Sequence, residues 1–230
     1  MGVFTAESKE ELENLILQHK EQINDGILID GWITGKILSS PNIQFNVGKT
    51  TKDDKFISCS EQILGNEGKV HLGNISNIDI LKQNKKLQKD IRIILDWIRS
   101  KKAFGISGID FIIVEEKGEQ KPYFMEINGR INGSTHGPIL MDKIYKNEKS
   151  PDNWAVNNNV HIPKGMNFDK FIEKLDKDGI LFSKENGGVL PTNISTINPE
   201  GIGSKVMVAL LNTTSKNAHE IINHLSTYGE

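Results

Sequence analysis

Residues 108–130 read GIDFIIVEEKGEQKPYFMEINGR, and they contain the most informative pattern in this chain of 230 residues. Two apolar runs, 108–114 and 122–127, are separated by a charged segment that contains one glycine. Apolar runs bounded in this way are typical of neighbouring antiparallel strands. We therefore predict a β-hairpin whose connecting loop covers 115–121.

The register of this hairpin follows if the pairing is centred on Gly118. Asp110 then lies directly across from Glu126, with Cβ atoms about 5 Å apart. Because side chains alternate along a strand, Phe124 and Asn128 are expected on the same face as Glu126. Two carboxylates this close repel each other unless a cation lies between them, and Mg²⁺ prefers oxygen ligands. The alternative is that both are exposed strand charges, because sequence alone defines a hairpin register weakly.

An arginine and a polar loop follow the second strand. Arg130 lies where a guanidinium can bind a phosphate or a carboxylate. Loops at strand ends often contact ligands, and the expected substrate-contacting side chains here are Asn132, Ser134, Thr135 and His136. Histidine titrates near neutral pH, so His136 is a candidate general base. Substrate positioning and simple exposure are the alternatives for this residue.

Composition describes an ordinary globular chain with balanced charge. It is 37% hydrophobic and 25% charged, with 28 basic and 30 acidic side chains. This balance does not favour binding of nucleic acid through phosphate attraction. The single cysteine, Cys59, excludes an internal disulfide and a thiolate zinc cluster, so a reducing, cytoplasmic setting is expected. No apolar run approaches the roughly 18 residues of a membrane span, so we expect no membrane role.

The rest of the chain alternates between helical and extended patterns. Ser8 and Glu11 match a capping box before an amphipathic helix that ends near 24–26. The other expected helices cover about 79–101, 139–147, 168–175 and 218–225, and the other expected strands cover 1–5, 27–29, 43–47, 56–60 and 206–211. Segments 65–73, 149–159 and 187–203 are expected to be connections, the last also fitting a substrate loop. These elements predict an α+β fold with a mostly antiparallel sheet and packed helices.

The amino-acid sequence of the hairpin resembles a known signature. Residues 108–112, GIDFI, and 123–130, YFMEINGR, resemble the metal-binding strands of the ATP-grasp ligases, which join a carboxylate to an amine or a thiol. The resemblance implies that Asp110, Glu126 and Asn128 bind the Mg²⁺ or Mn²⁺ ions that bridge the phosphates of ATP. It also implies that Arg130 stabilises the reacting carboxylate or the acyl phosphate.

A second stretch is similar to another part of the same family. Residues 27–35, ILIDGWITG, resemble the hinge that holds adenine, a strand followed by an acidic residue, an aromatic and a glycine. The implied ATP-binding residues are Asp30, Gly31, Trp32 and Ile33. Lys36 stands where many members have an acidic residue, which leaves the ribose contacts open. The sequences at 60–73 and 126–136 resemble those of peptide-ligase-like members of the family.

The resemblance also implies a division of the chain and an activity. It predicts an ATP-grasp fold that is incomplete at the N-terminus, with a partial nucleotide-binding subdomain at 1–78, a metal-binding subdomain at 79–148 and an α/β extension at 149–230. The implied reaction uses ATP and magnesium to activate a small carboxylate as an acyl phosphate and to join it to an amine, such as an amino acid or a peptide. The alternatives are a truncated or degenerate nucleotide-binding module without independent catalysis, or a subunit completed by a separate chain that supplies the N-terminal part.

Overall fold

The computed structural model describes residues 4–23, 26–65, 70–146, 153–197 and 204–229. The chain forms two compact units, 1–34 and 35–230, each of which is described by itself. No helix among the described residues is long and apolar enough to span a membrane.

The first unit contains the predicted N-terminal helix. Helix α1, Lys9–Gln18, is followed by the 3-10 turn η1, Lys20–Gln22. The Ser8 hydroxyl accepts a hydrogen bond from the backbone N–H of Glu11 at 3.1 Å, which confirms the predicted N-cap. The Glu11 carboxylate accepts from the backbone N–H of Glu7 at 2.8 Å. The reciprocal bond of the capping box is therefore made one residue earlier than predicted.

The predicted strand at 27–29 is wrong. This segment has no regular secondary structure, and Leu28 and Trp32 are 87% and 80% exposed. An extended segment becomes a strand only when a neighbour takes up its N–H and C=O groups. Among the described residues, none forms a ladder with this segment. Residues 4–5, the described part of the other strand predicted in this unit, are also irregular.

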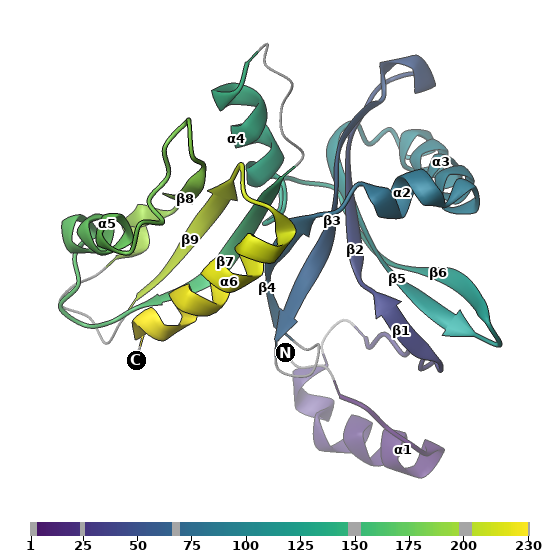
Figure 1. Ribbon diagram of the computed structural model, residues 1–230. Helices are drawn as coiled ribbons and strands as arrows, with labels where there is room; N and C mark the ends of the chain where they lie inside the picture. Colours follow the sequence, from purple (N-terminus) through teal and green to yellow (C-terminus); the bar gives the residue numbers. More distant parts are fainter. Residues whose placement is uncertain (1–3, 24–25, 66–69, 147–152, 198–203, 230) are drawn as a thin grey trace. The chain divides into compact units, whose positions relative to one another are not determined.

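The second unit is built on one sheet of nine strands, paired in the order β1-β5-β2-β3-β4-β7-β9-β8, with β6 on the other edge of β5 (Figure 1). The strands are β1 Lys36–Ser39, β2 Pro41–Val47, β3 Lys55–Gly65, β4 Val70–Ser76, β5 Gly105–Glu116, β6 Glu119–Asn128, β7 Trp154–Ile162, β8 Gly188–Pro191 and β9 Ser204–Leu211. Every ladder between these strands is antiparallel. The predicted α+β class with a mostly antiparallel sheet is confirmed.

Helices lie on both sides of this sheet. They are α2 Asp79–Gln83, α3 Lys85–Ser100, α4 His136–Ile144, α5 Phe168–Lys177 and α6 Ser215–Ser226, with 3-10 turns η2 Thr51–Asp53, η3 Ile194–Thr196 and η4 Thr227–Gly229. The predicted helix at 79–101 is two helices, because Asn84 is extended and its side chain caps α3 by accepting from the N–H of Leu87 at 2.9 Å. The predicted connections at 65–73, 149–159 and 187–203 contain the start of β4, the start of β7 and the whole of β8.

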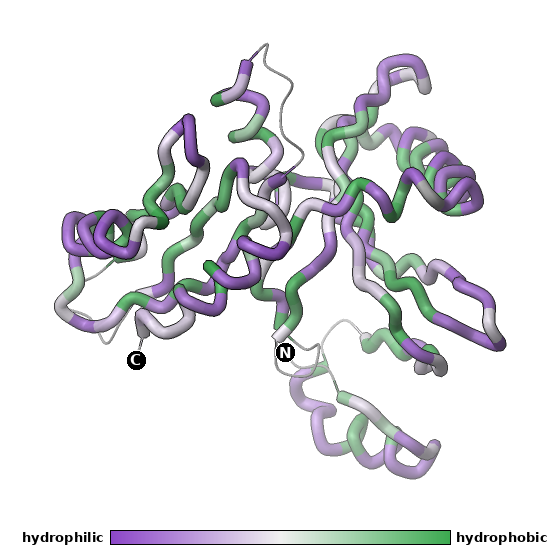
Figure 2. Tube along the Cα trace, viewed as in Figure 1, coloured by the Kyte–Doolittle hydropathy of each residue, from purple (hydrophilic) through white to green (hydrophobic). Residues whose placement is uncertain are grey.

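Apolar packing is concentrated on particular faces. The buried face of α3 packs against odd-numbered residues of β2 and β5, including Ile43, Ile109 and Phe111. Helices α5 and α6 pack with apolar residues of β7 and β9, and α4 packs with the residues that alternate with them. In Figure 2 the trace of β9 is coloured mostly as hydrophobic, and the trace of α5 is coloured mostly as hydrophilic. The face of β2, β3 and β5 opposite α3 carries buried polar residues instead.

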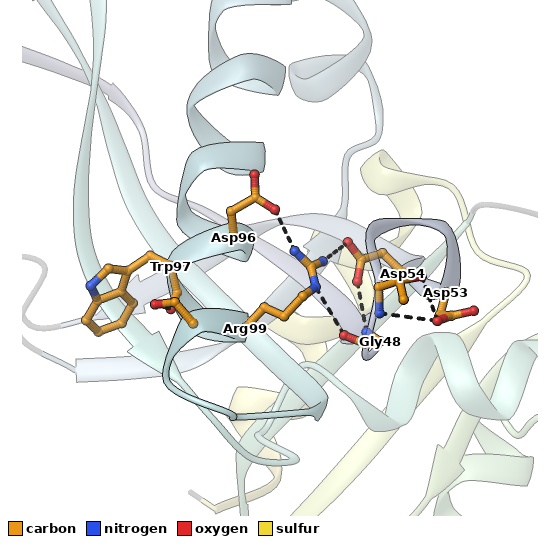
Figure 3. Close-up of polar contacts among 8 residues, drawn as sticks. Gly48, Asp53, Asp54, Asp96, Trp97 and Arg99 are labelled. Carbon is orange, nitrogen blue, oxygen red and sulfur yellow. Dashed lines mark hydrogen bonds and ion pairs between the residues drawn. The ribbon is translucent and has the colours of Figure 1, made fainter.

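An arginine joins the end of α3 to the connection between β2 and β3 (Figure 3). The Arg99 guanidinium lies 2.5 Å from Asp54 and 2.5 Å from Asp96, and its Nε donates to the carbonyl of Gly48 at 3.3 Å. The backbone N–H of Gly48 donates to Asp54 at 2.8 Å. This cluster fixes the hairpin of β2 and β3 against the helix behind the sheet.

We expect Arg99→Met to lower the urea concentration at half-unfolding, because it leaves the carboxylate of Asp54, only 16% exposed, without its cation. Asp96→Asn is the matched control, since its side chain is 63% exposed and water replaces the lost contact. Equal shifts for the two variants would contradict a structural role for the Arg99–Asp54 pair.

Candidate functional site

The hairpin of β5 and β6 has the predicted register at its functional end. Asp110 pairs with Glu126 in the ladder, as expected from the sequence. The turn, however, contains only Lys117 and Gly118, with φ of 53° and 79°, as in the two-residue turns that match strand twist. The predicted loop at 115–121 is therefore too long.

A β-bulge in β6 explains how a shorter turn leads to the same register. Phe111 pairs with Phe124, whereas Asp110 pairs with Glu126, so Met125 is the extra residue. The bulge also separates the faces of the strand. Phe124 packs with the core under α3, while Glu126 stands opposite Asp110. The prediction that Phe124 shares a face with Glu126 is wrong for this reason.

The carboxylate of Asp110 lies among three side-chain amides. Its Oδ1 accepts from Asn42 at 2.5 Å and from Gln62 at 2.8 Å, and its Oδ2 accepts from Asn128 at 2.8 Å. Burial raises the pKa of Asp110, the bonds from Asn42 and Gln62 oppose that change, and the charge of Glu126 adds to it. The site thus favours a cation beside these two carboxylates.

A hydrogen-bond network links this carboxylate to the polar loop. The amide of Gln44, completely buried, donates to Asn132 at 2.7 Å and to Asn42 at 2.9 Å. The Thr135 hydroxyl donates to the Gln44 carbonyl at 2.8 Å, and the Ser134 hydroxyl lies 2.9 Å from Asn42 Oδ1. Asn42 therefore joins Asp110 to the loop, and the loop is held against the sheet.

Two glycines allow this close approach. A Cβ atom on Gly108 would lie 2.8 Å from Asn132 Nδ2 and 2.9 Å from Gln44 Nε2. A Cβ atom on Gly133 would lie 2.6 Å from Asn158 Nδ2. Larger residues at either position would push the loop away from the sheet.

Arg130 and His136 differ in their surroundings. The guanidinium of Arg130 is exposed, and its Nη1 lies 3.5 Å from the carbonyl oxygen of Ile131. His136 begins α4, its Nε2 is buried without a hydrogen-bond partner in the described part of the chain, and burial lowers its pKa. The lowered pKa favours the neutral imidazole, and the exposed guanidinium of Arg130 is a cation that can meet an anionic ligand.

The second unit thus brings together half of the predicted site residues. Asp110, Glu126 and Asn128 are neighbours, and Asn132, Ser134 and Thr135 join them through the network. Asp30, Gly31, Trp32 and Ile33 belong to the first unit, and their expected role in holding adenine stays a prediction.

Sequence reasoning missed Asn42, Gln44 and Gln62. A signal was present, since polar residues at 42 and 44 alternate with apolar residues at 43, 45 and 47. A strand with one apolar and one amide-rich buried face predicts a polar network on that face.

The donor set fits a hard cation through oxygen ligands. Among the described residues, no three His, Cys, Asp or Glu side chains are grouped to hold a metal ion. A cation here would therefore rest on two carboxylates and on the amide oxygen of Asn128, whose nitrogen is turned towards Asp110. Few protein ligands are typical of Mg²⁺, which keeps waters and phosphate oxygens in its coordination shell.

Comparisons with known proteins concern the family and the fold of the chain. A family model described as ATP-grasp domain matches residues 2–134, more than half of the chain. No curated protein matches the sequence.

Solved structures share the fold at low sequence identity. N5-carboxyaminoimidazole ribonucleotide synthetase from Thermus thermophilus matches 97% of this chain with a TM-score of 0.61 and 13% identity. The Staphylococcus aureus N5-carboxyaminoimidazole synthetase, complexed with ADP, matches 98% with a TM-score of 0.59 and 12% identity. The carboxyaminoimidazole ribonucleotide synthase from Aspergillus clavatus, complexed with ATP, matches 98% with a TM-score of 0.57 and 14% identity. The chain spans 58% of the length of each.

The facing carboxylates lead to a titration experiment. Glu126→Gln is expected to lower the pKa of Asp110, because it removes a negative charge that raises it. ¹³C NMR titration of the Asp110 carboxyl carbon measures this shift, with Glu119→Gln at the tip of β6 as the control. An unchanged or higher pKa in Glu126→Gln would contradict the geometry.

The same raised pKa fixes the sign of a stability change. The folded state holds the Asp110 proton more tightly than the unfolded chain does, so this group destabilises the fold as pH rises from the ordinary aspartate pKa through the folded value. Glu126→Gln should reduce that loss of stability in urea unfolding measured across acidic pH.

Proposed function

Because this chain belongs to the ATP-grasp family, we propose that it carries the metal-binding part of an ATP- and magnesium-dependent ligase that joins a small carboxylate to an amine. The observation that supports this most is the pairing of Asp110 with Glu126 on a polar sheet face, with Asn128 beside them. We propose a cytoplasmic enzyme, consistent with one buried free cysteine, Cys59.

The metal would be held by Asp110, Glu126 and Asn128. When bound, Mg²⁺ supplies positive charge that neutralises the phosphates of ATP. The chain's own contribution is to keep those ligands in place. The amides of Asn42 and Gln62 orient the Asp110 carboxylate, so its position does not depend on the cation.

Arg130 would bind the anion that reacts. In the proposed reaction, a carboxylate oxygen of the substrate attacks the γ-phosphorus of ATP, the bond to the leaving ADP oxygen breaks, and an acyl phosphate forms. The amine then attacks the acyl carbon, and the C–O bond to phosphate breaks. An exposed guanidinium is suited to hold both the carboxylate and the acyl phosphate.

The loop after β6 would contact the substrates. Asn132, Ser134 and Thr135 are bonded to Gln44, and Ser134 and Thr135 are buried, so these side chains would fix the position of the loop rather than offer free hydroxyls to a substrate. Burial lowers the pKa of His136, which favours the neutral imidazole that would accept the proton lost by the attacking amine. In the first unit, Asp30, Gly31 and Ile33 would hydrogen-bond adenine through their backbone groups, and Trp32 would pack beside it.

We expect Glu126→Gln and Asp110→Asn each to weaken Mg²⁺-dependent ATP binding by about tenfold or more, because each removes a charged ligand. Isothermal titration calorimetry with and without Mg²⁺ measures the effect. Glu119→Gln, also on β6 but at the hairpin tip, should bind like the parent chain.

Equal binding by both variants and the parent would show that these carboxylates hold no metal. Phosphate release that depends on an added carboxylate and an added amine would demonstrate the ligase. ATP binding without such release would favour a nucleotide-binding module that needs a separate chain for turnover.

The hinge residues are tested separately. We expect Trp32→Ala to weaken ATP binding several-fold in the same calorimetric assay, through loss of packing against adenine. Trp97→Ala on α3 is the matched control, since Trp97 is also exposed, at 53% against 80% for Trp32. Equal effects of the two substitutions on ATP binding would contradict the proposal that adenine packs against Trp32.

A further inference from the structure

Helix α3 has a second apolar feature besides its buried face. Residues such as Ile91 and Leu95 pack against the sheet. Ile93 and Trp97 lie on another side of the helix and are 59% and 53% exposed. Because residues four apart lie above one another on a helix, these two side chains form one exposed apolar ridge. Figure 3 shows the Trp97 indole pointing away from the Arg99 cluster.

This exposed ridge continues into cations at both ends. Lys89 lies one turn before Ile93, and Lys86 lies two turns before it, on the same side of the helix. At the other end, Lys101 follows Trp97 by one turn, and its Nζ lies 5.5 Å from the centre of the indole ring. We call this set of exposed side chains the basic ridge: Lys86, Lys89, Ile93, Trp97 and Lys101.

The positive charge on this side of α3 is not balanced by acids. Asp90 lies on the same side but is partly buried, and Asp96 is bonded to Arg99. In the part of the chain that the structure describes, no ion pair involves the lysines of the basic ridge. Further exposed cations flank it, namely Lys85, Arg92 and Lys102. The basic ridge therefore offers apolar contact and positive charge together.

These charges decide which partner fits. A second copy of the chain would place lysines against lysines, which opposes self-association through the basic ridge. A lipid surface suits a helix whose broad apolar face is free to enter it, but the broad apolar face of α3 is buried against the sheet. Nucleic acid is not favoured by a chain with a net charge of -2. An acidic protein surface that also carries apolar residues matches both features of the ridge.

A helix is the partner element that fits a ridge. Side chains four apart on one helix pack into the grooves between the side chains of another. Tryptophan is among the residues that contribute most to binding when a partner buries them, and the lysines would form the polar rim. We propose that the basic ridge binds an acidic amphipathic helix of a partner protein, whose apolar residues pack on Ile93 and Trp97 and whose carboxylates face the lysines.

The proposed interface is remote from the proposed metal site. Helix α3 packs on the face of the sheet opposite the Asp110 network, so a helix bound to the basic ridge leaves that network uncovered. Binding to the ridge requires neither ATP nor magnesium. A failure of this proposal is therefore distinguishable from a failure of the ligase proposal.

The test is an NMR titration of the ¹⁵N-labelled full chain with a synthetic peptide helix of about five turns, with leucine on one face and glutamate on the other. Nucleotide and magnesium are left out. We expect saturable shifts of the indole N–H of Trp97 and of the backbone amides of Lys89, Ile93 and Lys101. The affinity for the peptide should fall as the salt concentration rises, because ions screen the attraction between the charges.

Trp97→Ala and Lys89→Glu should each weaken binding of the peptide by about tenfold, the first through lost apolar contact and the second through reversed charge. Each variant has a matched control. Trp32→Ala removes an exposed tryptophan of the first unit, and Lys177→Glu reverses an exposed charge on α5, so both should bind the peptide like the parent. Amide spectra that retain the parent's dispersion show that the variants are folded.

Three further probes separate the sources of binding. A peptide with lysine in place of glutamate should not saturate, and neither should one of the original composition without an apolar face. Vesicles of phosphatidylserine and phosphatidylcholine should leave the ridge amides unchanged. The proposal is overturned if the acidic peptide does not saturate, if either altered peptide binds as well, or if the vesicles produce the same shifts. It is also overturned if both Trp97→Ala and Lys89→Glu bind like the parent, or if the ridge amides shift with chain concentration alone, which would indicate self-association.

Discussion

A carboxylate that leaves water must find hydrogen-bond donors or a cation, and this requirement organises the functional face of the molecule. Asp110 meets it with amides from three neighbouring strands, since Asn42 lies on β2, Gln62 on β3 and Asn128 on β6. The same strands place apolar residues against α3 on the other face. One sheet therefore supports a polar site and an apolar core at once, and the buried Gln44 extends the site into the loop after β6.

The β-bulge at Met125 sets which side chain Asp110 faces. Without the extra residue, the two-residue turn at Lys117 and Gly118 would place Met125 across from Asp110, and Glu126 would lie on the other face. The sequence prediction reached the right pair through two errors that cancel. It centred the turn on Gly118 instead of between Lys117 and Gly118, and it omitted the bulge. Each error shifts the partner of Asp110 by one residue, in opposite directions. Bulges depend on local backbone geometry, which residue patterns express weakly, so the agreement is partly fortuitous.

Other parts of the fold show where sequence patterns are informative. The buried stripe of α3 and the Ser8 cap were predictable from local chemistry, whereas the Asn84 cap, which divides 79–101 into two helices, was not predicted. The segment 27–33 was not, because its apolar residues suggest a strand but pairing depends on a partner elsewhere in space. The amide residues at 42, 44 and 62 can be read from the sequence. Their role in binding Asp110 and the loop after β6 could not be predicted, because it depends on strands that the sheet order brings together.

The proposed metal links membership of the ATP-grasp family to one specific pair of carboxylates, Asp110 and Glu126. The most direct measurement is a crystal structure of the chain grown with Mn²⁺ and a non-hydrolysable ATP analogue, with anomalous scattering recorded at the manganese edge. We predict an anomalous peak between the carboxylates of Asp110 and Glu126, within bonding distance of both and of the nucleotide phosphates. A bound nucleotide whose manganese peak lies away from these two residues would contradict it.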